Sequence, residues 1–434
     1  MSPKLSAAVL AAGIALLPGG GEARATQDAQ EGLSRRVEQA PDGEVRFQFA
    51  ARPGVCGHED GISIRDEHRP GEGRSVMNWR SGWDEDECEV GPVHVALRVA
   101  GGRVLSADTR VASPFPARSG RVTELGTVPA AEAARYLVAL AGRADDGDLG
   151  EDVLLPVNLA EGVEPWPDML RLAREESLPA ETRKSAVFWL SQAENDEAGR
   201  ALAGLARARG LDREVREQAV FWLGQSQRDE ALEVLEEILR DEDDRELQKK
   251  AVFALSQHRS ARASALLREY AERPGGSGEV RQDAIFWLGQ TRSSENAAYL
   301  QDLFRRLDDP ELKDKVIFSL SQMRGVGSER WLLEVARDGG EPMETRKQAL
   351  FWAGQSGASL ADLARLYDAA DDVEIKEQLI FVFSQRRDDA AVEKLIDIVR
   401  RDPDRELRRK ALFWLGQSRD PRALRVITEL IEEP

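Results

Sequence analysis

One seven-residue pattern recurs eight times in the C-terminal part of this 434-residue chain and constrains its fold more than any other feature. Each copy has a small or aliphatic first residue, a phenylalanine third and a glutamine seventh, as in Ala219–Gln225 and Ala411–Gln417. Successive phenylalanines are 30 to 33 residues apart. A fixed period of this length is typical of repeat architectures, in which each copy is one small structural unit. The pattern therefore predicts an array of similar units rather than one globular core.

Each repeat contains two helical patterns, the motif segment and a second apolar-periodic stretch such as Ala231–Leu239. Neither helix can bury its apolar face alone, so neighbouring repeats must stack to share a continuous interior. We therefore predict a mainly α fold. Residues 176–434 form an α-solenoid of about eight helical hairpins, and a small β-rich domain precedes it.

Acidic residues mark the start of each motif helix. An aspartate stands nine positions before the phenylalanine in five copies, where it can cap the helix. These are Asp212, Asp244, Asp309, Asp372 and Asp404. A glutamate follows two positions later in all eight copies, where the helix dipole favours negative charge.

The motif phenylalanine lies outside the main apolar arc of its helix. At about 100° per residue it shares a stripe with the first-turn glutamate and the glutamine, so stacked repeats would form a ladder. Two interpretations stay open. The rings pack repeat on repeat, or they form a ridge that binds a partner. The candidate partner-binding ridge consists of Phe188, Phe221, Phe253, Phe286, Phe318, Phe351, Phe381 and Phe413, with Gln192, Gln225, Gln257, Gln290, Gln322, Gln355, Gln385 and Gln417.

A second regularity has twice the period. The residue before each glutamine alternates between serine and glycine, from Ser191 to Gly416. Tryptophan follows phenylalanine in every glycine copy but in only one serine copy, at Trp189. Either glycine makes room for a neighbouring tryptophan ring, or alternate repeats present different side chains to a periodic partner.

The segment from Asp404 to Leu424 resembles the HEAT-like repeat family, in the short bacterial form also found in phycobilin lyase-type proteins. The resemblance covers residues 176–434 as eight HEAT-like repeats and implies a protein-binding scaffold. It also implies that the aspartates and the bases four residues after them link neighbouring repeats. Those bases are Arg216, Lys313, Lys376 and Arg408. A phenylalanine in a place that the family usually fills with a polar residue is a departure from its pattern.

Residues 1–25 have the features of an export signal. Lys4 precedes an apolar run that Pro18 breaks, and Ala23 and Ala25 supply small residues for cleavage after Ala25. The run is too short to span a bilayer as a helix, so we expect no transmembrane anchor. Residues 26–43 are interpreted as a polar linker. We expect the product to be exported, either periplasmic or secreted.

Residues 44–128 are predicted to form the β-rich domain, with a hairpin around Gly101-Gly102. Cys56 and Cys88 are expected to pair, which would contribute about 3 to 4 kcal/mol by closing the intervening loop. The alternative is a zinc site that adds ligands from His58, His68 and His94. Residues 129–175 are predicted to be helical and to cap the first repeat.

A net charge of -18 and the absence of a basic stripe argue against nucleic acid as a ligand. No catalytic motif is recognisable, and we assign no catalytic residue, metal or cofactor to the chain. The leading hypothesis is a noncatalytic scaffold for a protein or peptide partner, preferably basic. The alternatives are an enzyme or metal-binding protein acting through the Cys/His domain, and a lyase by analogy with bilin lyases. We also expect weak self-association through the C-terminal repeat, which keeps its full motif.

Overall fold

A computed structural model describes residues 32–58, 61–65, 75–78, 88–117, 119–241, 243–291, 293–323, 325–386, 388–418 and 420–432. The signal segment and His68 lie outside these residues. The chain divides into two compact units, Met1–Ala219 and Val220–Pro434, and we describe each by itself.

The first unit begins with a short helix over residues 32–38, inside the segment that the sequence analysis interprets as a linker. Leu33 and Val37 of this helix are buried, with exposed fractions of 0% and 2%. The linker prediction is wrong here, because two aliphatic side chains spaced four residues apart lie on one face of a helical turn.

A four-stranded sheet follows, with the strand order β6-β5-β1-β7. Its strands are β1 (Gly43–Phe49), β5 (Val93–Ala100), β6 (Arg103–Val111) and β7 (Val122–Thr127). Strand β1 is antiparallel to β5 and parallel to β7. Gly101 and Gly102 both have positive φ, at 59° and 73°, and form the two-residue turn between β5 and β6. This confirms the predicted hairpin, because such turns need two residues that tolerate positive φ.

A second, three-stranded sheet has the order β2-β3-β4. Its strands are β2 (Val55–His58), β3 (Gly61–Arg65) and β4 (Ser75–Asn78). A disulfide joins Cys56 of β2 to Cys88, which confirms the predicted pair. It uses both sulfur atoms that the alternative zinc site would need.

Helices occupy the segment predicted to cap the first repeat. They are α2 (Ala130–Ala141), α3 (Gly147–Asp152), α4 (Leu154–Asn158) and α5 (Trp166–Arg174). Gly150 of α3 lies against the first motif helix, since a Cβ there would come within 2.0 Å of Thr182 Oγ1.

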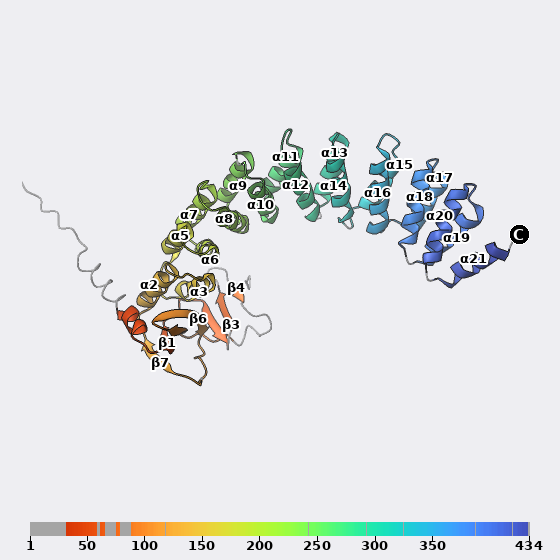
Figure 1. Cartoon of the computed structure of the whole chain (residues 1–434). Helices are drawn as coiled ribbons and strands as arrows, with labels where there is room; N and C mark the ends of the chain where they lie inside the picture. The colour runs from red at the N-terminus through yellow and green to blue at the C-terminus, as the bar shows by residue number, and fades with distance from the viewer. Residues whose placement is uncertain are drawn as a thin grey trace, which may run out of the picture. The chain divides into compact units, whose positions relative to one another are not determined.

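The described residues from 180 to 432 form eight helical hairpins, an α-solenoid as predicted. The motif helices are α6 (Ala180–Ser191), α8 (Arg213–Gln225), α10 (Arg245–Gln257), α12 (Gly278–Gln290), α14 (Pro310–Ser321), α16 (Met343–Ser356), α18 (Val373–Ser384) and α20 (Arg405–Gln417). The second helices are α7 (Asp196–Arg207), α9 (Asp229–Asp241), α11 (Ala261–Glu272), α13 (Ser294–Arg306), α15 (Ser328–Arg337), α17 (Leu360–Ala369), α19 (Asp389–Arg401) and α21 (Pro421–Glu432). In the second unit, the motif helices from α10 to α18 form one layer and the helices paired with them form another (Figure 1). Within the described part of the chain, every helix is too short or too polar to cross a membrane.

Four of the five predicted aspartate caps form. The carboxylates of Asp244, Asp309 and Asp404 each accept hydrogen bonds from two first-turn amides, and Asp212 accepts one from Glu214 N. Asp372 makes no side-chain cap hydrogen bond, so that prediction is wrong. Its Oδ2 instead lies 2.8 Å from Arg346 Nη1 of the preceding repeat, because the guanidinium competes for the same carboxylate.

The position five residues before the motif phenylalanine ties successive helices together. Arg183, Arg281 and Arg346 each donate from Nε to a backbone carbonyl that precedes their helix, at 3.1 Å. Such carbonyls lack partners within their own helix end. The outer nitrogens of two of these arginines also reach the aspartate of the next repeat, in the pairs Arg183–Asp212 and Arg346–Asp372. Aspartates therefore do link to the preceding repeat, but the bases in these two pairs are Arg183 and Arg346 rather than those that the resemblance implied. Of the implied bases, Lys313 pairs with Glu341 instead.

The alternating glycines mark the closest approaches between motif helices. A Cβ at Gly224 would come within 2.6 Å of Ala254 Cα, and one at Gly289 within 2.8 Å of Ser319 Cβ. Ala254 and Ser319 are the residues that follow phenylalanine in the next, serine-type copy. Glycine therefore makes room for the backbone and a small side chain, not for a tryptophan ring as one interpretation held. The three serine copies that follow a glycine copy have Ala254, Ser319 and Val382 at this position, because the approach leaves no space for a tryptophan there.

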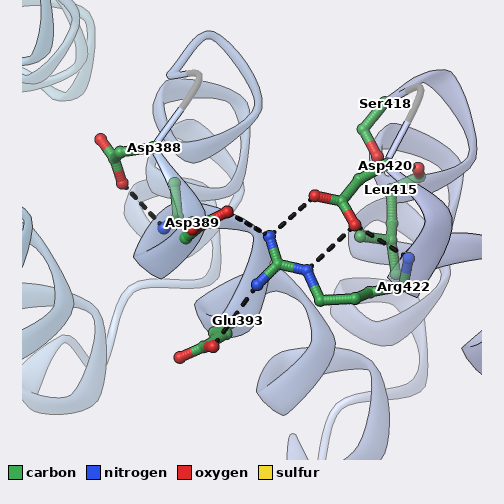
Figure 2. A network of polar contacts seen from close by, with 8 residues as sticks. Asp388, Asp389, Glu393, Leu415, Ser418, Asp420 and Arg422 are labelled. Carbon is green, nitrogen blue, oxygen red and sulfur yellow. Dashed lines mark hydrogen bonds and ion pairs between the residues drawn. The ribbon is translucent and has the colours of Figure 1, made fainter.

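The last hairpin closes with a polar network around Arg422 of α21 (Figure 2). Its guanidinium donates to Asp389 Oδ1 of α19 at 2.7 Å and to both carboxylate oxygens of Asp420. A weaker bond reaches Glu393 at 3.4 Å. These bonds lower the pKa of Asp420 to about 2, so the carboxylate stays charged and holds the start of α21 against α19.

The close approach at Gly224 predicts an unusual response to alanine. Gly224→Ala should lower the free energy of unfolding by roughly 1 to 3 kcal/mol, because the methyl group would overlap Ala254. The matched control is Gly204→Ala in α7, where the nearest heavy atom to a new Cβ is 4.0 Å away. There alanine should stabilise the chain by roughly 0.5 to 1 kcal/mol through helix propensity. Urea denaturation followed by circular dichroism measures both, and equal shifts in the two variants would contradict the packing argument.

Candidate functional site

The motif helices of the second unit carry a continuous row of aromatic rings, which we name the aromatic ribbon. Its residues are Phe221, Trp222, Phe253, Phe286, Trp287, Phe318, Phe351, Trp352, Phe381, Phe413 and Trp414. Two kinds of contact alternate along it.

Across each glycine approach, two phenylalanines stack. The ring centroids of Phe221 and Phe253 are 6.1 Å apart at an interplanar angle of 11°, and Phe286 and Phe318 repeat this at 6.2 Å and 10°. At the next step a tryptophan edge meets the phenylalanine, as in Phe253–Trp287 at 4.8 Å and 60°. Each such pair contributes about 0.5 to 1.5 kcal/mol beyond area burial. The phenylalanines thus have a packing role between repeats.

The ribbon keeps part of its surface accessible. Its phenylalanines are half-buried except Phe413, which is 59% exposed. Lys315 Nζ lies 5.9 Å from the ring centre of Phe286 and 6.0 Å from that of Phe318, within range of a cation–π contact with both. In the first unit, Phe188 is also half-buried and meets the edge of Trp189.

The motif glutamines fall into two groups that follow the serine–glycine alternation. In serine copies the side-chain amide donates to the preceding hydroxyl, and that hydroxyl donates to the phenylalanine carbonyl three residues back. This arrangement holds at Gln192, Gln257, Gln322 and Gln385. In glycine copies no hydroxyl is available. There the glutamines are exposed and, among the described residues, make no side-chain hydrogen bond; they are Gln225, Gln290, Gln355 and Gln417.

First-turn glutamates add a row of negative charge to the motif helices. Glu246 and Glu279 belong to successive repeats, are 53% and 55% exposed, and both pair with Lys249 at 3.0 and 2.9 Å. Hydrogen bonds to Glu279 and Glu246 hold the pKa of Lys249 above its usual range. Partial burial raises the pKa of Asp283 and of Asp314, the acidic side chains next along α12 and α14. The shifts of the two aspartates come from desolvation, and nothing in them singles out an acid–base pair.

Two histidines have clear structural surroundings. His258 is buried, and its Nδ1 lies 3.0 Å from the Oγ of Ser260, the residue that caps α11. His94 lies on β5 next to the sheet core, and burial lowers its pKa. Among the described residues, His, Cys, Asp and Glu side chains form no cluster of three or more suited to a metal ion.

Sequence reasoning placed the ridge on phenylalanine and glutamine and left out the tryptophans. The structure brings Trp287, Trp352 and Trp414 into the ribbon between phenylalanines of successive repeats. The signal was present in the sequence, because a tryptophan follows phenylalanine in every glycine copy.

Comparisons with known proteins find the repeat in two parts of the chain. A model of HEAT repeats matches residues 167–256 and 201–277, and a model of the PBS lyase HEAT-like repeat matches residues 407–433. A sequence search among curated proteins gives no significant match.

Solved structures of similar fold have low sequence identity. Human deoxyhypusine hydroxylase is 18% identical over 55% of this chain and 91% of its own, with a TM-score of 0.27. The phycocyanin lyase complex from Nostoc sp. PCC7120 is 18% identical over 53% of this chain and 92% of the matched chain, with a TM-score of 0.28. Yeast importin-beta is 13% identical over 66% of this chain and 44% of its own, with a TM-score of 0.38. Similarity at this level assigns no activity. The segments that the two repeat models match are HEAT-like repeats, and they coincide with helical hairpins of the array.

Proposed function

We propose that the chain is an exported, noncatalytic scaffold that binds a basic protein or peptide along the aromatic ribbon. The observation that carries this proposal is the pairing of half-buried rings with glutamines whose amides make no hydrogen bond to any residue that the structure describes. Half-exposed aromatic side chains supply contact area, and free amides can donate to and accept from a peptide backbone.

The spacing of the open glutamines suits an extended partner. Gln225, Gln290 and Gln355 recur every second repeat along one layer of helices, 65 residues apart in sequence. Each stands three residues after a ribbon tryptophan. A surface that repeats in this way favours a long segment contacted at several points, whose individually weak contacts add up.

Charge supports a basic partner. The chain has a net charge of -18, and exposed first-turn glutamates such as Glu246, Glu279 and Glu344 lie on the motif helices. Attraction between exposed charges is screened over about 8 Å at physiological ionic strength, so binding should weaken as salt rises.

The two groups of glutamines provide a test of the ribbon. Replacing Gln290 and Gln355 with Ala should reduce the yield of partner crosslinked to the protein in its native envelope, detected by mass spectrometry. The melting temperature should stay unchanged, because these amides make no hydrogen bond with the described part of the chain.

The matched control replaces Gln257 and Gln322, whose amides are bound to Ser256 and Ser321. This variant should lose up to about 1 kcal/mol of stability per hydrogen bond and retain most of the crosslinked partner. Equal crosslinking losses in both variants, or none in the first, would argue against recognition by the open glutamines.

Export rests on two observations. Residues 1–25 have the pattern of a cleavable signal, and the Cys56–Cys88 disulfide is of the kind that persists in oxidising compartments. Mass spectrometry of the protein from the envelope or medium should show Thr26 as its first residue and no free thiol. A chain that retains residues 1–25, or carries two free thiols, would contradict this proposal.

The C-terminal hairpin supports weak self-association. Phe413 is 59% exposed and Leu424 is 69% exposed, whereas the ribbon phenylalanines before them are half-buried. In sedimentation equilibrium the apparent mass should rise with concentration, and the double variant Phe413→Gln, Leu424→Gln should remain monomeric. A wild-type mass that stays monomeric at all concentrations would overturn this part of the proposal.

A further inference from the structure

A cavity of about 290 Å³ in the second unit has the chemistry of an anion site. It lies where the C-terminal ends of α9 and α11 meet the first turn of α12. The side chains of Arg240, Arg273 and Arg281 line it, together with Tyr270, Gln248 and the loop that ends at Ser277. Among the described residues that line the cavity, three are arginines and none is acidic. This is a local excess of positive charge in a chain of net charge -18.

Comparison with other repeats shows that the first turn of α12 lacks a capping carboxylate. In α10, α14 and α20 an aspartate nine residues before the phenylalanine directs its carboxylate at the first-turn amides. Ser277 occupies this position in α12 and makes no side-chain cap hydrogen bond. The cation that would face such a carboxylate from the preceding repeat is also absent, because Gln248 replaces the Arg183 or Arg346 of other copies.

The repeat at α16 places a carboxylate near this position although its capping aspartate is lost. At α16 the residue is Pro342, and Glu341 next to it accepts hydrogen bonds from Lys313 of the preceding repeat at 2.7 and 2.8 Å. The step into α12 has no such acid: the loop before it reads Arg273-Pro-Gly-Gly-Ser277.

The arginines around the cavity keep donors available. Arg273 uses Nη1 for Leu239 O and the Tyr270 hydroxyl, and Arg281 uses Nε for Ala271 O. Their remaining nitrogens have no partner within the described residues. Within the described residues, the ion pairs of Arg240 are long, at 3.9 Å to Glu236 and 3.7 Å to Asp241. Guanidinium groups bind carboxylates through two parallel hydrogen bonds, so these donors match the chemistry of the absent group.

We propose that this cavity binds a small carboxylate, which takes the place of the capping aspartate found at α8, α10, α14 and α20. The ligand accepts hydrogen bonds from Arg273 and Arg281 and lies at the positive end of the α12 dipole. Binding is independent of the aromatic ribbon and of any macromolecular partner.

The experiment titrates the full-length chain with sodium malonate by isothermal titration calorimetry, with sodium chloride of matched ionic strength as the blank and sodium phosphate as a second arm. We expect saturable binding of malonate that is tighter than that of phosphate. Arg273→Gln and Arg281→Gln should each weaken it at least about tenfold, the effect of losing a charge-assisted hydrogen bond. Arg346→Gln, which changes the same repeat position outside the cavity, should leave it unchanged.

A gain-of-carboxylate variant tests the proposal without removing an arginine. Ser277→Asp should fill the position from within the chain, abolish malonate binding and raise the melting temperature, whereas Ser277→Ala should still bind malonate. Three results would overturn the inference: no saturable binding by the wild-type chain, tighter binding of phosphate than of malonate, or unchanged malonate binding by Ser277→Asp.

Discussion

The close approach of successive motif helices is the constraint on which the second unit depends. An amphipathic hairpin about 30 residues long cannot bury its apolar face alone, so its stability comes from contact with the repeats before and after it. At every second step the contact is so close that only glycine fits, with Gly224 against Ala254 and Gly289 against Ser319. This approach also brings the two phenylalanines of the pair into a stack. Steric fit at one backbone position thus sets both the two-repeat period and the geometry of the aromatic ribbon.

The same constraint divides the motif glutamines into two groups with different hydrogen bonding. A serine copy has a hydroxyl that engages the following glutamine, whereas a glycine copy leaves that glutamine open to solvent. A residue selected for packing therefore determines which side chains are available to a partner. Polar links also hold successive repeats together. An arginine five residues before the phenylalanine donates to a backbone carbonyl and, in two repeats, pairs with the capping-position aspartate of the following repeat. The cavity beside α12 is the place where this series of carboxylates is interrupted.

Much of the fold was predictable from individual residues. The eightfold motif indicated the hairpins, the Gly101-Gly102 turn indicated the β5–β6 pair, and two lone cysteines indicated the disulfide. These features are local or depend on counting, so no tertiary information was needed. Two errors have a different origin. Residues 32–38 were interpreted as linker because a short helix with Leu33 and Val37 buried has little periodic signal in the sequence. Asp372 was assigned a cap from its position alone, and its ion pair with Arg346 is visible only in three dimensions.

The sequence by itself determined the repeat, its period, the class of the fold and the sites of most helix caps, because each of these depends on spacing along the chain. Only the tertiary structure decided what the alternating glycine is for, which glutamines are free and where positive charge gathers. Those properties depend on distances between residues about 30 positions apart in sequence, such as Gly224 to Ala254 or Arg240 to Arg273. A one-dimensional pattern shows that such residues recur. It cannot show which of them touch, because contact depends on how closely two helices approach and on which side chains fit between them.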